Sequence, residues 1–187
     1  MKLEQIQEQV QKMLSEKRYY HSICVMERCA ELAEKFGVDV ETAKKVGIAH
    51  DVAKEMLEEE KIKYAKENNI EIDEVEKENT GLLHAKIGAD IAKKQFGFSD
   101  EMAEAIKAHT TGSINMDVLS KILFISDRTS KERNFSDIEL LNHLLNKSID
   151  EAVLYILDKK ILLQIEKRQS MHPNSIIARN DILRKIK

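Results

Sequence analysis

One proline, Pro173, and six glycines stand in a chain of 187 residues. A β-sandwich or a barrel needs many turns, and tight turns depend on these two residue types. Apolar residues instead recur at the spacing of one helix face, beginning with Leu3, Ile6, Val10, Met13 and Leu14. We find no segment with the alternating pattern of a strand. The sequence therefore predicts an all-α fold, a single-domain helical bundle over residues 1–187.

Capping residues and glycines suggest where the helices begin and end. Helices are expected at 3–14, from near Tyr20 to Gly37, from Asp39 through His50 and Asp51, and at 54–68, 83–96, 100–108, 116–127, 148–167 and 175–186. Residues 71–79 look like a connection with a short helical turn. Ser136 to Glu139 and Ser148 to Glu151 each have the sequence of a capping box. Two charge runs, 58–61 and 159–160, are predicted to be solvated helix faces.

Charge and cysteine content narrow the class of protein. The formal net charge of −3 provides no overall attraction to nucleic acid, so an anionic ligand needs a local site. We expect neither a nucleic-acid partner nor a membrane span. Cys24 and Cys29 are too few and too closely spaced for a disulfide framework, and both fit the buried face of a helix. The reducing cytoplasm is the expected compartment, and the oligomeric state, including a homodimer, is left open.

The chain's chemistry is concentrated in histidines and aspartates near predicted helix ends. His50 and Asp51 are adjacent, Asp127 closes an apolar run, and three further histidines are His21, His84 and His109. Imidazole and carboxylate ligands without thiolates suit Fe, Mn, Co, Ni or Zn. The alternative for each histidine is a structural role, and for Asp127 an ion pair with Arg128 or Lys131. The joint pattern favours a metal centre.

Two segments of the sequence echo each other. Ala30 to Gly37 is followed by Ala49-His50, and Ala89 to Gly97 is followed at nearly the same distance by Ala108-His109. Each segment has one histidine at its front and one at its back. We interpret them as two helical hairpins that each bring two histidines to one end. Chance similarity between two amphipathic hairpins is the alternative explanation.

His21, the His50-Asp51 pair and Asp127 match the pattern that names the HD superfamily of metal-dependent phosphohydrolases. The chain also resembles the YqeK family, symmetrically cleaving diadenosine tetraphosphate hydrolases of bacteria. This resemblance rests on residues 18–22, 50–54, 83–85, 109–112, 121–124, 171–173 and 178–180. It implies a helical bundle of the HD-domain type, with the metal-site core at about 18–133 and the helices of 136–187 completing a nucleotide pocket.

The resemblance also implies roles for individual residues. The metal ligands that it implies are His21, His50, Asp51 and Asp127. Together with Lys54 they form the implied catalytic set. The ion that it implies is iron. His84 and His109 would hold a second ion or contact phosphate. Lys54 and Arg133 would neutralise the polyphosphate, Arg133 through a bidentate contact. The implied nucleotide contacts are His21, Lys54, His84, His109, Asp127, Arg133, Met171, His172, Pro173, Asn174 and Ser175.

One segment departs from the family pattern. Relatives have the pattern Asp-x-Ile-Glu-Pro-x-Arg after the last metal aspartate, whereas this chain has Ser130-Lys131 in place of Glu-Pro and keeps Arg133. The role of the missing glutamate is therefore in question. The expected activity is hydrolysis of diadenosine tetraphosphate to two ADP. The alternatives are a nucleotidase, a nucleoside-triphosphate hydrolase on the same metal site, or a nucleotide-binding module with slow turnover.

Overall fold

The computed structural model describes residues 1–133 and 136–186. Its helices are α1 (Leu3–Met13), α2 (Glu16–Phe36), α3 (Val40–Ala49), α4 (Glu58–Glu67), α5 (Glu74–Glu78), the 3-10 turn η1 (Thr80–Leu82), α6 (Leu83–Phe96), α7 (Asp100–Ala108), α8 (Val118–Thr129), α9 (Ile138–Lys147), α10 (Ile149–Glu166) and α11 (Pro173–Lys185). No strand occurs in these residues, which confirms the all-α class. The predicted domain of 1–187 also includes Asn134, Phe135 and Lys187, which lie outside the described residues.

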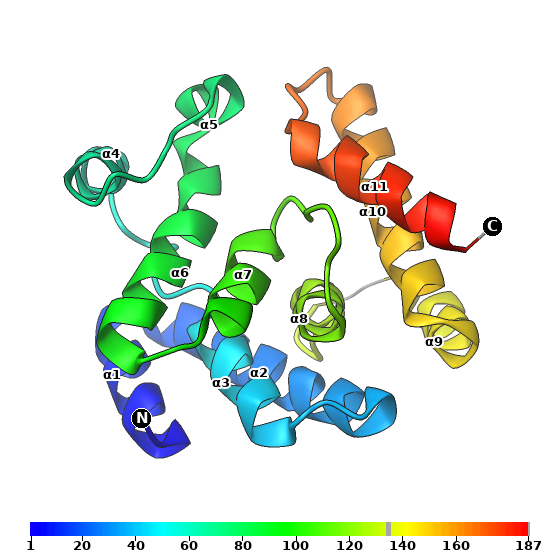
Figure 1. Ribbon diagram of the computed structural model, residues 1–187, viewed down its shortest axis with the longest axis horizontal. Helices are drawn as coiled ribbons and strands as arrows, with labels where there is room; N and C mark the ends of the chain where they lie inside the picture. Colours follow the sequence, from blue (N-terminus) through cyan, green and yellow to red (C-terminus); the bar gives the residue numbers. More distant parts are fainter. Residues whose placement is uncertain (134–135, 187) are drawn as a thin grey trace.

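Helix α8 is the central element of the fold. It packs against α2 and α3 on one side, and against α7 and α10 on others (Figure 1). Its apolar side chains Leu119, Ile122, Leu123, Phe124 and Ile125 are almost completely buried. Burying each such side chain contributes about 1.5–3 kcal/mol. The strongly apolar run in the sequence therefore becomes the helix around which the others pack.

The two predicted hairpins are present and pack against each other through α3 and α7. Helices α2 and α3 form one, and α6 and α7 form the other (Figure 1). Gly37 and Gly97 end α2 and α6 in the left-handed conformation, with φ of 70° and 72°, which glycine adopts without steric cost. His50 is the C-cap of α3 and His109 the C-cap of α7. The hairpins thus place two histidines at equivalent helix ends.

Several predicted helix bounds differ from the structure, by about two to four residues. Helix α2 begins at Glu16, because the Ser15 hydroxyl caps it by accepting from the Arg18 amide, so His21 lies inside the helix. Helix α8 continues to Thr129 and places Asp127 in its last turn. The helix predicted from Lys54 begins only at Glu58, after a non-helical segment that follows His50. These shifts decide which way the site residues face.

The structure agrees with the two predicted capping boxes to different extents. Asp137, rather than Ser136, is the N-cap of α9, and its side chain accepts no capping hydrogen bond. Its carboxylate instead accepts from Tyr155 and pairs with Lys159. Ser148 does cap α10, but its hydroxyl accepts from the Asp150 amide one residue earlier than a box requires. The first prediction is wrong, and the second is right only in its capping serine.

Two further predictions concern the cysteines and the membrane. Cys24 and Cys29 are free and buried, as predicted. Among the described residues, no helix combines the length and the apolar character that crossing a bilayer requires.

The crossing of α2 and α3 depends on Gly47. A Cβ atom there would lie 2.8 Å from the Met26 Cα and 3.2 Å from the Cys29 Sγ. We expect Gly47→Ala to lower the free energy of unfolding by about 1–3 kcal/mol through overpacking. Gly88→Ala is the matched control, because its Cβ would meet nothing closer than 3.5 Å, and alanine favours a helix interior. Urea unfolding measures both variants, and equal midpoints would contradict this account of the helix crossing.

Candidate metal centre and active site

Three histidines share one hydrogen-bonding arrangement. The Nδ1 atoms of His50, His84 and His109 face the carbonyl oxygens of Gly47, Gly81 and Ile106, each three residues earlier. A carbonyl oxygen only accepts, so each Nδ1 carries a proton, and in the neutral form of the ring the Nε2 keeps its lone pair. The helix ends provide these carbonyls, which explains why the histidines occur there. In metal-binding histidines, a hydrogen bond from the ring nitrogen that does not face the metal fixes the orientation of the ring.

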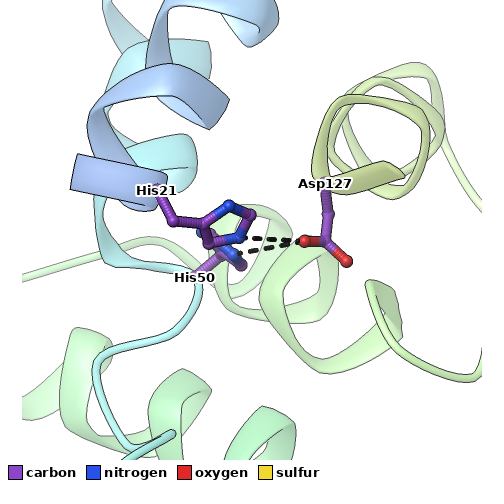
Figure 2. Close-up of side chains that lie close together, drawn as sticks. All are labelled: His21, His50 and Asp127. Carbon is purple, nitrogen blue, oxygen red and sulfur yellow. Dashed lines mark hydrogen bonds and ion pairs between the residues drawn. The ribbon is translucent and has the colours of Figure 1, made fainter. Parts of the chain in front are cut away.

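His21 has the same orientation, with its Nε2 toward the site, but a different kind of partner faces its Nδ1. It lies inside α2, where the backbone carbonyls accept the helical hydrogen bonds, and its Nδ1 faces the Glu132 carboxylate instead. Its Nε2 lies 3.1 Å from the Asp127 Oδ1. Figure 2 shows His21 and His50 pointing together at this Asp127 oxygen. Glu132 therefore does for His21 what a carbonyl does for the other three histidines.

The Nε2 atoms converge on two carboxylates. His84 and His50 lie 3.2 and 3.4 Å from oxygens of Asp51, with His109 and His21 slightly farther away. The four rings form a chain with centroids 5.0–5.2 Å apart. The two hairpins predicted from the sequence therefore do bring their histidines together.

This donor set fits a divalent metal ion. Two groups have ligand atoms close enough to share one ion, His21/His50/Asp127 and His50/Asp51/His109. The Nε2 of His50 is buried and has no hydrogen-bond partner among the described residues. A buried lone pair without a partner is costly, and a metal ion would satisfy it. His50 has only its Nε2 left for a metal and can ligate one ion at a time, so a second ion would take its ligands from Asp51, His84 and His109.

Burial and neighbouring charges set the protonation of the site. Burial alone would raise the pKa of Asp51, but His50, His109 and His84 lower it well below its usual range. Asp127 has a similarly lowered pKa, because His21, His50 and Arg133 outweigh its burial. Burial lowers the pKa of His84 to about 4. The site thus holds ionised carboxylates beside a neutral imidazole, the forms that bind metals.

Cations surround the cleft above these ligands. The cleft has a volume of about 270 Å³ and is lined by Arg18, Asp51, Lys54, His109, Thr110, Asp127, Arg128 and Arg133. Arg18 pairs with Asp51 at 3.0 Å, and Arg133 with Asp127 at 2.8 Å. Lys54 lies 3.3 Å from the His84 Nε2, and burial lowers its pKa. Four cationic side chains at one small opening favour a polyanionic ligand.

Comparison with known proteins places the chain in a family. The sequence model of the HD domain matches residues 18–132. This chain belongs to the HD domain family. It is 30% identical over 171 residues, 91% of both chains, to a protein of Halalkalibacterium halodurans named symmetrical bis(5'-nucleosyl)-tetraphosphatase. A Bacillus subtilis protein of the same name is 28% identical over 91% of this chain and 92% of its own.

A solved structure agrees closely with the fold of this HD domain protein. The structure comes from Clostridium acetobutylicum and is described as a predicted HD superfamily hydrolase involved in NAD metabolism. The two chains are 33% identical, and 97% of each is covered with a TM-score of 0.92. The expected HD-type helical bundle is therefore confirmed, and its His/Asp groups can hold a divalent metal.

The Met171–Ser175 turn includes the first residues of α11, which begins at Pro173 rather than at the predicted Ser175, and it does not line the metal cleft of the HD domain. His172 caps α11, its Nδ1 accepts from the Asn174 amide, and its Nε2 lies 2.7 Å from Asp73. Asp73, Glu76 and His172 are also close enough for a metal, but Lys86 already pairs with Glu76. Protein partners account for this cluster without an ion. The hydroxyl of Ser175 donates to the Thr111 carbonyl, which ties the turn to the segment after His109.

Several residues near the site escaped the sequence analysis or were interpreted wrongly. Asp127 does not pair with Arg128 or Lys131: Arg128 faces the cleft, and Lys131 pairs with Glu27. Glu132 follows the Ser130-Lys131 departure by one position, and nothing in its local sequence connects it to His21. Of the two charge runs, Glu58, Glu59, Glu60 and Lys159 are exposed as predicted. Lys61 is buried and Lys160 is half-buried, so the prediction is wrong for both.

Proposed function

We propose that this protein hydrolyses diadenosine tetraphosphate to two molecules of ADP. The observation that carries the proposal is a set of His/Asp ligands at the floor of a cleft ringed by four cations. Relatives that match nearly the whole chain are named symmetrical bis(5'-nucleosyl)-tetraphosphatases, which supports this substrate class. A linear tetraphosphate carries several negative charges, and the cleft provides cations to neutralise them.

His21, His50, Asp51 and Asp127 are the proposed ligands of the principal metal, with iron the expected ion. His84 and His109 would complete a second position or contact phosphate. When bound, the metal supplies Lewis-acid stabilisation of the phosphoryl oxygens and makes a water more acidic. The protein's own contribution begins with holding Asp51 and Asp127 as ionised carboxylates. Carbonyls and Glu132 keep the protons on Nδ1, away from the metal side.

The cations of the cleft position the phosphates. Lys54 has no carboxylate ion pair among the described residues and lies beside His84, so its ammonium is available to a phosphate. Arg133 and Arg18 pair with the two carboxylates and can offer their remaining N–H groups to the substrate. In phosphoryl transfer most of the catalytic effect comes from such positioning and charge neutralisation.

Seating of the phosphates decides which anhydride bond breaks, because the attacking water must be in line with the leaving oxygen. We place one nucleoside diphosphate on Lys54, Arg133 and the Met171–Ser175 turn, so that its second phosphorus is attacked and the other diphosphate leaves intact. Helices α9 to α11, within 136–186, complete the nucleotide pocket in this proposal.

A substrate panel tests the proposed activity. Full-length protein, purified without chelator, is incubated with diadenosine tetraphosphate, ATP, ADP and cyclic AMP, and the products are resolved by ion exchange. We expect turnover of diadenosine tetraphosphate with ADP as the sole product. Turnover of mononucleotides only would instead indicate a nucleotidase or nucleoside-triphosphate hydrolase, and binding without turnover would indicate a nucleotide-binding module.

A further inference from the structure

A second cavity adjoins the metal cleft. It lies along the exposed side of α10, has a volume of about 320 Å³, and is lined by Arg128, Ile156, Lys159, Lys160, Leu163 and Gln164. Arg128 lines both this groove and the metal cleft, so the two cavities meet at its side chain. We call this cavity the α10 groove. Its size is within the usual range for small-molecule sites.

The end of the groove nearest the cleft is cationic. Neither Arg128 nor Lys160 forms an ion pair within residues 1–133 and 136–186, although Lys159 pairs with Asp137. The Lys160 ammonium donates to the carbonyl oxygen of Thr110. Burial and the neighbouring Arg128 lower the pKa of Lys160 to about 7. Arg128 is a cation without an ion-pair partner among the described residues, and an anion beside Lys160 would favour its protonated form, so the pair suits an anionic group next to the site for phosphates.

The rest of the groove suits a nucleobase. Leu163, which is 48% exposed, provides most of the apolar surface, and Ile156, which is 3% exposed, lies beneath it as the floor. The amide oxygen of Gln164 is buried and has no hydrogen-bond partner among the described residues. A primary amide can pair with the N6 and N7 edge of adenine. An apolar wall, one unsatisfied amide and a cationic end together match the parts of an adenine nucleotide.

The α10 groove also lies against the segment that follows the site residue His109. Lys160 contacts the carbonyl of Thr110, and Ser175 of the Met171–Ser175 turn contacts the carbonyl of Thr111. The groove and the turn therefore contact consecutive residues of the segment that follows His109. A substrate with two identical halves needs two nucleoside seats near one reacting centre.

We propose that the α10 groove binds the second nucleoside diphosphate of the substrate, the half that leaves. Its phosphates lie between Arg128 and Lys160, and its adenine packs on Ile156 and Leu163 with the Gln164 amide at its edge. This assignment rests on the proposed function for the identity of the substrate. It makes the groove the element that distinguishes a dinucleoside polyphosphate from a mononucleotide.

Calorimetric titration of the full chain with ADP tests the assignment. We expect two ADP molecules per chain in the wild-type protein and one in Leu163→Asp, because the new carboxylate repels the nucleotide. Leu162→Asp is the matched control: Leu162 is 56% exposed on the same helix and does not line the groove, so two ADP should still bind. Gln164→Leu should weaken the second site about tenfold, the effect of one lost hydrogen bond.

The kinetic counterpart is kcat/KM for diadenosine tetraphosphate, which Leu163→Asp should lower about tenfold or more. A single ADP per wild-type chain, or a stoichiometry unchanged by Leu163→Asp, would overturn the assignment. Failure of the groove assignment can be distinguished from failure of the proposed function. Two ADP sites without cleavage of the tetraphosphate would reject the function alone, whereas cleavage with one ADP site would reject the groove alone.

Discussion

Asp51→Ala should abolish hydrolysis of diadenosine tetraphosphate and the binding of its metal while the helical fold is retained. The Asp51 carboxylate lies within 3.8 Å of the Nε2 atoms of all four site histidines and also holds Arg18. Loss of a ligand to a catalytic metal costs several kcal/mol of transition-state stabilisation, or about 10³-fold or more in rate. The apolar faces of the helices do not include this side chain, so the fold does not depend on it.

Three measurements check this expectation: activity at saturating metal, metal content after purification, and far-ultraviolet circular dichroism. Asp100→Ala is the control, since Asp100 is exposed and, within residues 1–133 and 136–186, its ion-pair partner is Lys93. It should match the wild-type protein in all three. Near-wild-type turnover by Asp51→Ala at saturating metal would show that the centre is not built on this aspartate.

The second large effect is expected at Glu132. Glu132→Ala leaves the Nδ1 of His21 without the partner that fixes its proton and ring orientation. Loss of such a partner weakens metal binding by about 10–100-fold. Glu132→Gln should lose less, because an amide oxygen still accepts a hydrogen bond from Nδ1 but carries no charge.

Metal affinity is measured by competition with a chelating dye, which is independent of catalytic turnover. Glu27→Ala serves as the control: Glu27 is exposed and pairs with Lys131, the residue before Glu132. Its metal affinity should stay at the wild-type value. If Glu132→Ala and Glu27→Ala bind metal equally well, Glu132 has no orienting role.

The sequence was informative where local chemistry determines the structure. Gly37, Gly97, Asp39 and Ser99 end or cap helices at the predicted places, because these residues act on backbone groups within a few positions. The histidines at the helix ends could be found for the same reason. Their Nδ1 partners lie three residues earlier, so residue type and local position are enough to suggest the geometry.

The sequence was uninformative where partners are distant. Glu132 is 111 positions from His21, and only the packing of α2 against α8 brings them together. Lys160 follows an exposed lysine and resembles an ordinary solvated residue, yet α10 turns its ammonium toward the Thr110 carbonyl. The wrong start of α2 has a local cause, because the Ser15 cap was overlooked. Which side chains face a shared cleft follows from tertiary packing rather than from propensity.

Symmetrical cleavage requires that the attacked phosphorus is seated over the His/Asp ligands, and hydrolysis in oxygen-18 water shows which phosphorus is attacked. Diadenosine tetraphosphate is hydrolysed by the full chain for a single turnover, and the products are examined by mass spectrometry. We expect ADP as the only nucleotide product, with one solvent oxygen in half of the ADP formed. Label in AMP, with ATP as the second product, would contradict it, because the phosphates would then be seated one position away.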